Sequence, residues 1–404
     1  MPININPQKI EKILTRGVEN IYPNRKSLEK FLKSGKKLRI YNGIDPTGNL
    51  HLGHAVVLRK LRQFQDLGHE IIVLIGDFTA TIGDPTGKEA TRKPLTRGQV
   101  FKNARGYKKQ IGKILDLKKA NVRFLHNEEW TNKLKLRDML ELASKFTVAR
   151  LLERDMFQER IKKGRDIRVH EFLYPIFQAY DSVTMDVDLE IGGNDQTFNM
   201  LACRELIKKM KNKEKFVLTL KLLTDPKGKK MGKTEGNIVN LDERPGNMYG
   251  KIMAWPDSLM SLGFELLTDI PMDEINKFLT QIEKGEINPR DLKAKLAKEV
   301  VILCHNKEAA QMAEKEFERI FREKKLPTRM PEIQIKENSL NILDLLLKTK
   351  LVSSKSEAKR LILQKAVEIN NQLKEDWREN IKIKKGMVIQ VGKRRFAKIS
   401  YSKS

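Results

Sequence analysis

Cysteine and long apolar runs are scarce in this sequence, and each scarcity excludes a class of protein. Only 2 of the 404 residues are cysteine, Cys203 and Cys304, and they form no C-x-x-C pair. A disulfide framework or a zinc cluster is therefore not expected, and a reducing cytoplasm is the predicted compartment. The longest aliphatic run, 71–75, is far shorter than the ~20 residues that a membrane-spanning helix needs. The N-terminal residues also lack the pattern of a secretory signal.

Glycine and proline, with 24 and 14 residues, are too few for a fibrous or low-complexity chain. Apolar residues make up 40% of the sequence, which is too many for a disordered chain. At roughly 150 residues per domain, the length predicts two or three domains with cores of their own.

Positive charge exceeds negative charge by a wide margin. Lys and Arg number 79 against 52 Asp and Glu, which gives a net charge of +27. Such an excess favours a polyanionic partner, because cationic side chains neutralise phosphates and release counterions. A surface loaded with solvated lysine is the alternative. Residues 341–404 hold 16 Lys and Arg against 6 Asp and Glu, so the excess is concentrated at the C-terminal end.

The first half of the chain has the pattern of an α/β fold. Residues 38–44 predict a strand that ends at a loop rich in Asp, Pro and Gly. Apolar residues over 57–67 recur at helical spacing, and the run 71–75 predicts a strand buried on both faces. Together they predict a right-handed βαβ unit in a parallel sheet. Ligands of such sheets bind beyond the carboxyl ends of the strands, where the loops 45–54 and 83–88 would lie.

The second half predicts helices and then hairpins. Residues 285–325 carry apolar stripes at helical spacing, and 324–331 predict a linker. A capping box opens a predicted helix over 355–364. Alternating apolar residues beyond it, with turns at 370–371 and 392–393, predict hairpins.

His51 and His54 open the first helix, directly after the loop. Imidazole donors and the N–H groups of a helix N-terminus together make a site suited to nucleotide phosphates, and Gly53 allows a ligand to approach closely. Metal ligation by the H-x-x-H pair is an alternative, but no nearby Cys or His cluster completes a coordination shell. Chance is another, although the chain has only 6 histidines.

Lys230 and Lys233 lie in the glycine-rich stretch KMGKT. A loop with two ammonium groups can close on a triphosphate and neutralise charge as pyrophosphate leaves. Because lysine is abundant in this chain, an accidental K-x-x-K is the alternative.

Residues 83–88 (GDPTGK) resemble a phosphate loop but lack the glycine spacing and the Ser or Thr of a Walker A motif. The prediction is a turn at a strand end that presents Asp84, with Lys88 and Arg92 as phosphate contacts. A plain turn is the alternative.

Tyr174, Gln178 and Asp181 lie at i, i+4 and i+7, which places three polar groups on one helical face. A core tyrosine with solvated neighbours is the alternative. Residues 192–196 (GGNDQ) predict a glycine turn that brings a carboxylate and an amide close to a ligand, with a simple hairpin turn as the alternative.

In their order along the chain, HLGH, GDPTGK, YxxxQxxD, GGNDQ and KMGKT resemble the class I aminoacyl-tRNA synthetases, and specifically the tyrosyl-tRNA synthetases. HLGH is similar to the first signature motif of that class, and KMGKT is similar to the second. The C-terminal stretch LVSSKSEAKRLILQKAVEINNQ resembles an RNA-binding module shared with a small-subunit ribosomal protein. The resemblance spans about residues 38–400, with weaker support over 100–165.

The resemblance implies an α/β protein in three parts. Residues 1–240 would form a Rossmann-like catalytic domain with a parallel sheet and an insertion at about 100–165. Residues 241–330 would form a helical domain that binds the anticodon arm of tRNA, and residues 338–404 a small α+β RNA-binding domain. A homodimer with its interface in 100–165 is also implied.

The resemblance further implies a tyrosine–tRNA ligase, which activates L-tyrosine with ATP to tyrosyl-adenylate and diphosphate and then charges the 3′ end of tRNA(Tyr). Such catalysis needs no protein nucleophile and depends on positioning and charge stabilisation. The implied phosphate contacts are Thr47, His51, His54, Lys88, Arg92, Lys230 and Lys233, and the implied ribose contacts are Gly193 and Asp195. The implied tyrosine contacts are Asp84, Tyr174, Gln178 and Gln196 at the ammonium, Tyr41 and Asp181 at the hydroxyl, and Asp45 near the adenylate.

Two other functions are weighed against this one. Tryptophan specificity is disfavoured because a pocket for indole does not need Tyr41 and Asp181, the pair that would bind a hydroxyl. A non-catalytic RNA-binding paralogue is disfavoured because both histidines and both motif lysines are present. Magnesium is expected to arrive with ATP as part of the substrate, without a tightly held protein metal site.

Overall fold

The computed structural model describes residues 2–84, 95–224, 238–321, 330–392 and 395–401. By its internal contacts the chain divides into two units, Met1–Glu243 with Trp255–His305, and Arg244–Ala254 with Asn306–Ser404. Within the described ranges, no helix is both long and apolar enough to cross a membrane.

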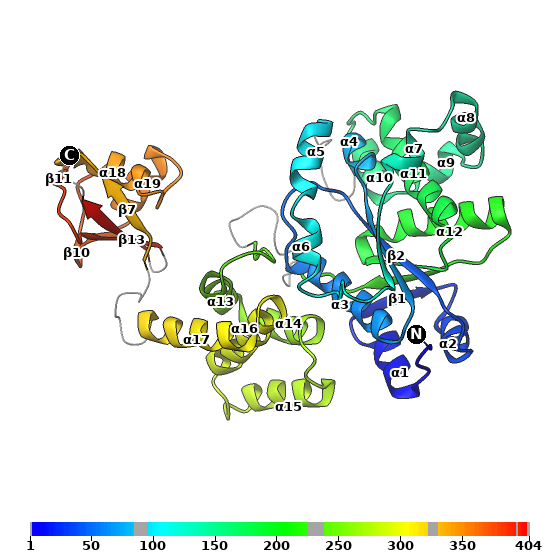
Figure 1. The fold of residues 1–404 in the computed structure, drawn as a ribbon, viewed down its shortest axis with the longest axis horizontal. Coiled ribbons are helices and arrows are strands. Elements are labelled where there is room, and N and C mark those ends of the chain that lie inside the picture. Colours follow the sequence, from blue (N-terminus) through cyan, green and yellow to red (C-terminus); the bar gives the residue numbers. More distant parts are fainter. Residues whose placement is uncertain (1, 85–94, 225–237, 322–329, 393–394, 402–404) are drawn as a thin grey trace. The chain divides into compact units, whose positions relative to one another are not determined.

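The described part of the first unit contains a six-stranded sheet with the order β1-β6-β5-β2-β3-β4 (Figure 1). Only β1 is antiparallel to its neighbour, and the other adjacent pairs are parallel. The strands are β1 (Val18–Tyr22), β2 (Arg39–Ile44), β3 (Glu70–Ile75), β4 (Val122–His126), β5 (Leu189–Gly193) and β6 (Phe216–Leu220).

The predicted βαβ unit is confirmed, since α3 (Leu52–Asp66) connects the parallel strands β2 and β3. Residues 71–75 of β3 are all buried, as predicted, and β2 and β4 pair with this strand on either side. The helix ends just before Gly68, whose φ of 96° suits glycine.

The strand order reverses between β5 and β2. The connection from β2 leads to β3 on one side, and the connection from β5 leads through α12 (Thr197–Lys211) to β6 on the other. Right-handed crossovers in opposite directions place α3 and α12 on opposite faces of the sheet. The carboxyl ends of β5 and β2 therefore frame a crevice of the kind that binds ligands in open α/β sheets.

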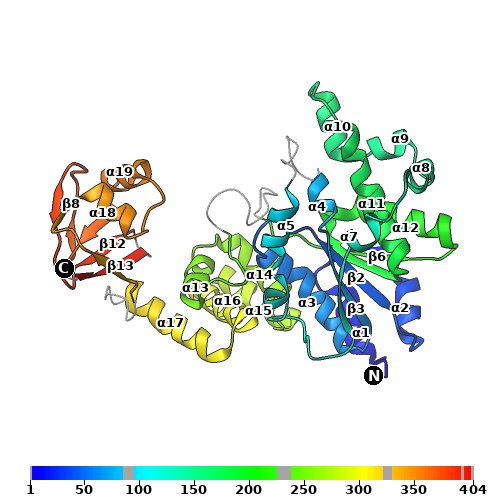
Figure 2. The same ribbon diagram turned by 45° about the horizontal axis from the view of Figure 1, so that its top comes forward.

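The region between β3 and β5 carries most of the remaining helices of this unit. β4, which lies in the predicted insertion at 100–165, forms the edge of the main sheet. Residues of α8 and α9 share a hydrophobic cluster with α11 and α12 (Figure 2). The helices of this region are α4 (Thr79–Ile82), α5 (Arg97–Ala104), α6 (Tyr107–Ile111), α7 (Glu128–Thr131), α8 (Leu136–Ser144), α9 (Val148–Leu152), α10 (Asp155–Lys162) and α11 (Val169–Met185).

The first unit also includes the N-terminal helices and a helical group that follows the sheet in sequence. Within it, α14 packs against both α3 and α16. The elements are α1 (Pro7–Thr15), α2 (Arg25–Lys33), α14 (Met260–Leu267), α15 (Met272–Glu283) and α16 (Pro289–Cys304).

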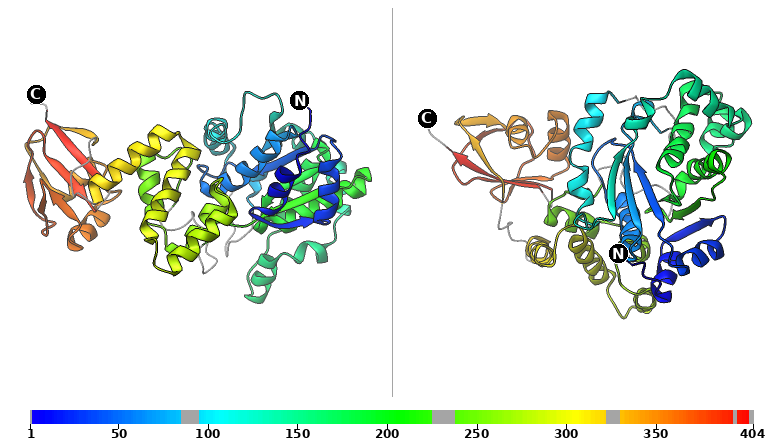
Figure 3. Two further views of the ribbon diagram at one scale, coloured as in Figure 1. Left: turned by 90° about the horizontal axis from the view of Figure 1, so that it is seen from below. Right: turned by 45° about the vertical axis from the view of Figure 1, so that its right-hand side comes forward.

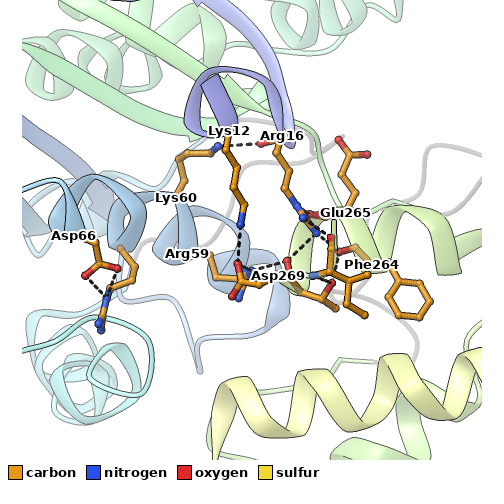
Figure 4. A network of polar contacts seen from close by, with 11 residues as sticks. Lys12, Arg16, Arg59, Lys60, Asp66, Phe264, Glu265 and Asp269 are labelled. Atoms are coloured by element: carbon orange, nitrogen blue, oxygen red, sulfur yellow. Dashed lines mark hydrogen bonds and ion pairs between the residues drawn. The ribbon is translucent and has the colours of Figure 1, made fainter. Parts of the chain in front are cut away.

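Two buried basic side chains join α1, α3 and α14 (Figure 4). Arg16 donates to the carbonyl oxygens of Glu265 and Thr268, each at 2.8 Å, and so satisfies the C-terminal end of α14. Lys60 of α3 donates to the carbonyl oxygens of Ile13 and Arg16 at 2.7 and 2.9 Å. The N-terminal segment is therefore fixed to both helices.

The second unit includes α13 (Pro245–Met253) and α17 (Lys307–Phe321), which pack together with the rings of Tyr249 and Phe317 5.4 Å apart. The predicted helical region 285–325 is thus divided between α16 and α17, within its described part, by a break after Cys304.

The C-terminal residues form a sheet with the order β10-β9-β12-β13-β7 and a β11-β8 pair, in orange to red in Figure 3. Their core includes Leu345, Ile362 and Ile389, each fully buried. The elements are β7 (Glu332–Ile335), β8 (Ser339–Asn341), α18 (Ile342–Lys348), α19 (Lys355–Leu363), β9 (Val367–Ile369), β10 (Gln372–Leu373), β11 (Asn380–Lys382), β12 (Val388–Val391) and β13 (Arg395–Tyr401).

The predicted helix over 355–364 and the hairpins are confirmed. Ser354 accepts from the N–H of Glu357 as predicted. However, the carboxylate of Glu357 accepts from the N–H of Ser353 at 2.8 Å, so the cap extends one residue further back.

Candidate active site

A pocket of about 280 Å³ opens at the carboxyl ends of β2 and β5, beside the N-terminus of α3 and the polar face of α11. Lys88, Arg92, Lys230 and Lys233 lie outside the described residues. All the other predicted site residues line this pocket: Tyr41, Asp45, Thr47, His51, His54, Asp84, Tyr174, Gln178, Asp181, Gly193, Asp195 and Gln196.

His51 and His54 form the N-terminal cap of α3. The N–H of His51 donates to Nδ1 of His54, and the N–H of Gly53 donates to Nδ1 of His51, each at 3.1 Å. A ring nitrogen that accepts a hydrogen bond carries no proton, so both neutral imidazoles carry their proton on Nε2. The rings lie 4.1 Å apart. The N–H groups of residues 52–55 already donate within the protein. The two Nε2–H groups are therefore the donors at this positive helix end, which suits phosphate oxygens.

The loop that holds Thr47 is tied to α5 and α6. Asn103 donates through Nδ2 to the carbonyl oxygen of Pro46 at 2.8 Å. Tyr107 donates through its hydroxyl to the carbonyl oxygen of Gly48, and burial raises the pKa of Tyr107 to about 12. Sequence reasoning missed both anchors, because they are ordinary residues far from the loop in sequence.

Asp45 connects β2 to two other elements of the pocket. Tyr174 of α11 donates to Oδ2 of Asp45 at 2.8 Å, and Thr79 of α4 donates to Oδ1 at 2.7 Å. A Cβ atom at Gly76 would lie 2.1 Å from Oδ1, so only glycine fits beside this carboxylate. The geometry therefore holds Asp45 and the hydroxyl of Tyr174 in fixed orientations.

The prediction that Asp84 lies in a turn at a strand end is wrong. The short helix α4 separates Asp84 from β3. Gln196 donates through Nε2 to Oδ2 of Asp84 at 2.9 Å. Arg154, only 4% exposed, lies 3.4 Å from Oδ1. These contacts bring three distant segments together around one carboxylate. Arg154 was missed because nothing distinguishes it locally from the many other cations of this chain.

Asp181 lies on α11 in a fully buried position, as the polar face of Tyr174, Gln178 and Asp181 predicts. Trp130 donates through Nε1 to Oδ1 of Asp181 at 2.7 Å, and Asn127 donates through Nδ2 to Oδ2 at 3.2 Å. Burial raises the pKa of Asp181 to about 8, although both donors act in the opposite direction. Sequence reasoning missed Trp130 and Asn127.

Tyr41 lies in β2 and is fully buried. Its hydroxyl is 2.8 Å from Oγ of Ser182, the neighbour of Asp181, and 3.8 Å from Sγ of Cys203. Burial raises the pKa of Tyr41 well above its usual value, so the hydroxyl stays protonated.

The glycine turn predicted over 192–196 is present, but it leads from β5 through a short 3₁₀ turn into α12 and is no hairpin. A Cβ atom at Gly193 would lie 2.6 Å from Oδ1 of Asp195 and 2.8 Å from Leu222. Any larger residue at position 193 would therefore displace the side chains of Asp195 and Leu222.

The pocket contains three kinds of chemistry. The carboxylate of Asp84 suits an ammonium group, the buried carboxyl group of Asp181 suits a hydroxyl, and the cap of α3 suits phosphates. The described residues contain no group of three His, Cys, Asp or Glu side chains arranged to hold a metal ion.

Two family models match the chain. The model for class I tRNA synthetases (W and Y) matches residues 33–322, and the model for the tyrosine–tRNA ligase SYY-like C-terminal domain matches residues 323–399.

Similar proteins cover the whole chain. The tyrosine–tRNA ligase of Carboxydothermus hydrogenoformans is 46% identical over 100% of both chains, and that of Thermotoga maritima is 44% identical over 98% of both. Among solved structures, a C-terminally truncated mitochondrial tyrosyl-tRNA synthetase of Coccidioides posadasii is 26% identical to this chain, with a TM-score of 0.62. The match covers 76% of this chain and 91% of the Coccidioides chain. The Aspergillus nidulans counterpart has the same fold, with a TM-score of 0.65 at 24% identity. That match covers 78% of this chain and 94% of the Aspergillus chain.

Proposed function

The chain belongs to the tyrosine–tRNA ligases within the class I tRNA synthetases, and we propose that the pocket at the ends of β2 and β5 is where it joins tyrosine to ATP. The observation that carries this proposal is the convergence of the imidazole pair of α3 and the polar face of α11 on one pocket. A reaction between tyrosine and ATP needs phosphate donors and amino-acid contacts on one pocket.

In the first step a carboxylate oxygen of tyrosine attacks the α-phosphorus of ATP. The bond from this phosphorus to the oxygen bridging the α- and β-phosphates breaks, and diphosphate leaves with the electron pair. Thr47, His51 and His54 donate to the phosphate oxygens as charge moves toward the leaving group. Magnesium arrives bound to the phosphates of ATP, as part of the substrate.

Lysines and an arginine outside the described residues complete the phosphate site. Lys230 and Lys233 clamp the departing diphosphate, and Lys88 and Arg92 assist. The support for these roles is the order of the motifs along the sequence, together with the family match over residues 33–322.

The tyrosine substrate is held at both ends. Asp84, Tyr174, Gln178 and Gln196 bind its ammonium group, while Asp45 lies near the adenylate. Tyr41 and Asp181 bind its hydroxyl, and these hydrogen bonds are lost when phenylalanine enters. For tyrosyl-tRNA synthetases in general this discrimination is about 10⁵-fold, a value for the family and not one derived from this chain.

In the second step a hydroxyl of the 3′-terminal ribose of tRNA(Tyr) attacks the carbonyl carbon of tyrosyl-adenylate. The ester bond to tRNA forms, the bond from the carbonyl carbon to the phosphate oxygen breaks, and AMP leaves. Gly193 and Asp195 hold the ribose of the adenylate in place.

The tRNA is held outside the pocket by the other two parts of the chain. Residues 1–240 form the catalytic domain, residues 241–330 bind the anticodon arm, and residues 338–404 bind RNA. The match over 323–399 and the concentration of positive charge at the C-terminal end support this division. The cytoplasm is the proposed compartment, and the two free cysteines, both buried, are compatible with it.

The enzyme acts as a homodimer whose interface lies in 100–165. Leu136, Leu140 and Val148, on α8 and α9, are 79%, 65% and 66% exposed. Exposed apolar side chains gathered on neighbouring helices are typical of a protein–protein interface.

Exchange of labelled pyrophosphate into ATP tests the proposed function. We expect exchange that requires tyrosine and that tryptophan does not support. Exchange with tryptophan in place of tyrosine would contradict the assigned specificity, and the absence of exchange with any amino acid would contradict the catalytic role.

A further inference from the structure

A buried ion pair lies at the pocket, with Glu190 in its lining and Lys215 behind Glu190. Lys215, which precedes β6, is fully buried, and Glu190 of β5 is 2% exposed. Nζ of Lys215 donates to Oε2 of Glu190 and to Oγ of Ser182, the latter at 2.9 Å. An ion pair in such a position has a large desolvation cost, so its presence calls for a specific role.

Hydrogen bonds connect the pair to two proposed tyrosine contacts, directly to Gln178 and through Ser182 to Tyr41. Gln178 donates through Nε2 to Oε1 of Glu190 at 3.0 Å. The hydroxyl of Tyr41 lies 2.8 Å from the same Oγ of Ser182 that accepts from Lys215. A continuous series of contacts thus connects Gln178, Glu190, Lys215, Ser182 and Tyr41.

Glu190 decides which way the amide of Gln178 points. A carboxylate only accepts hydrogen bonds, so it selects the orientation in which Nε2 of Gln178 faces it. The carbonyl oxygen of Gln178 is then the atom that remains for the substrate, and a carbonyl oxygen is what an ammonium group needs. An uncharged amide at position 190 would accept either orientation of Gln178.

Lys215 fixes the other end through Ser182. An ammonium group only donates, so Oγ of Ser182 must accept from Lys215 and is held in place beside the hydroxyl of Tyr41. Lys215 also lies 5.2 Å from the centre of the Tyr41 ring. The same cation neutralises Glu190. Without Lys215, the carboxylate of Glu190 would be an unpaired negative charge near the ammonium site.

We propose that Lys215 and Glu190 are positioning residues for tyrosine recognition, acting on the ammonium end through Gln178 and on the hydroxyl end through Ser182 and Tyr41. This inference rests on the proposed roles of Gln178 and Tyr41 in binding tyrosine. It adds that one buried ion pair holds both Gln178 and Tyr41 in position.

The hydroxyl end is tested with Ser182→Ala, which removes the bridging oxygen and keeps both charges. Pyrophosphate exchange is measured with tyrosine and with phenylalanine. We expect kcat/KM for tyrosine to fall about tenfold, the effect of losing roughly one hydrogen bond, while the value for phenylalanine and the KM for ATP stay unchanged. An equal fall for both amino acids, or no fall, would overturn this part of the inference.

The ammonium end is tested with Glu190→Gln and two inhibitors. Tyrosinol has the ammonium group but no carboxylate, and 3-(4-hydroxyphenyl)propionate lacks the ammonium group. We expect the inhibition constant of tyrosinol to rise about tenfold while that of the propionate is unchanged. A general loss of structure would weaken both inhibitors, and that result would overturn the proposed role of Glu190.

The cation itself is tested with Lys215→Met and with the double variant Lys215→Met/Glu190→Gln, which leaves no unpaired buried charge. We expect the double variant to lose discrimination against phenylalanine and affinity for tyrosinol together. Lys60→Met is the matched control, because Lys60 is a second buried lysine that does not line the pocket. Unchanged discrimination in the double variant, or an equal loss in Lys60→Met, would refute the inference.

Tyr41→Phe and Gln178→Ala separate this inference from the proposed function. If they impair recognition of the hydroxyl and the ammonium group while the Ser182, Glu190 and Lys215 variants do not, only the positioning role fails. If Tyr41→Phe and Gln178→Ala themselves have no effect, the assignment of the tyrosine contacts fails, and the inference fails with it.

Discussion

The indole N–H of Trp130 donates to Oδ1 of Asp181 at 2.7 Å, across 51 positions of sequence. Asn127 occupies the other carboxylate oxygen at 3.2 Å, so two donors from one segment orient the carboxylate. Asp181 is only 2% exposed. A substrate hydroxyl therefore meets a preorganised acceptor, which is the basis of the first prediction.

Asp181→Ala should abolish most of the preference for tyrosine over phenylalanine, because the substrate hydroxyl loses its hydrogen-bond partner. The preference should fall by about 10³-fold or more, measured as the ratio of kcat/KM values in pyrophosphate exchange. Asp186→Asn, at the half-buried C-terminal cap of the same helix, is the control and should leave the ratio unchanged. An unchanged ratio in Asp181→Ala would refute the assignment.

His54→Ala should slow tyrosine activation by removing an Nε2–H donor from the phosphate site. We expect kcat to fall by about 10²-fold, the usual effect of losing one preorganised donor, with little change in the KM for tyrosine. Because this change also removes a cap from α3, Asn24→Ala serves as the control; it removes the cap of α2 and should lower stability alone. A rise in KM for tyrosine without a fall in kcat would argue against a phosphate contact.

Lys60 should make stability depend on pH. Burial, reinforced by Arg16, lowers the pKa of Lys60 to about 7, whereas an unfolded lysine has a pKa of about 10.4. Between these values the unfolded chain holds a proton that the folded chain lacks. The contribution of Lys60 to the free energy of unfolding therefore rises with pH in this range, by at most about 1.4 kcal/mol per unit, and is constant below it.

Urea unfolding of the wild type and of Lys60→Met at pH 7 and at pH 9 measures this contribution. We expect the stability of the wild type relative to the variant to be greater at pH 9. Parallel pH dependences of the two proteins would show that Lys60 stays protonated in the folded state.

Deletion of the residues after Pro331 should uncouple the two steps of the reaction. The C-terminal part has its own core, so its removal should leave tyrosyl-adenylate formation intact. Charging of tRNA should fall, and the remaining activity should depend less on salt because phosphate contacts are lost. An intact charging rate would count against an RNA-binding role for this part.

The double change Leu136→Lys/Leu140→Lys should convert a dimer into a monomer, because it places charge in the proposed interface. Light scattering after size-exclusion chromatography gives the mass directly. Leu363→Lys is the control, since Leu363 is also exposed, at 61%, but lies on α19. A dimer of unchanged stability in the double variant would exclude this surface as the interface.

Local sequence determined the elements with strong patterns. The strand over 71–75, the helix after His51 and the hairpin at Asn370 and Asn371 were predictable, because apolar periodicity and turn chemistry act within a few residues. The polar face of α11 was predictable for the same reason, since three polar groups at helical spacing are a local pattern.

Only the tertiary structure decided which other residues contact the predicted site residues. Trp130, Arg154 and Lys215 have no local signal, and each contacts a predicted residue from a distant segment. The position of Asp84 was also misjudged, because a four-residue helix is too short to leave a periodic pattern. Burial and hydrogen-bond partners depend on how segments pack, so the roles of a tryptophan, an arginine and a lysine emerged only once the chain was folded around the pocket.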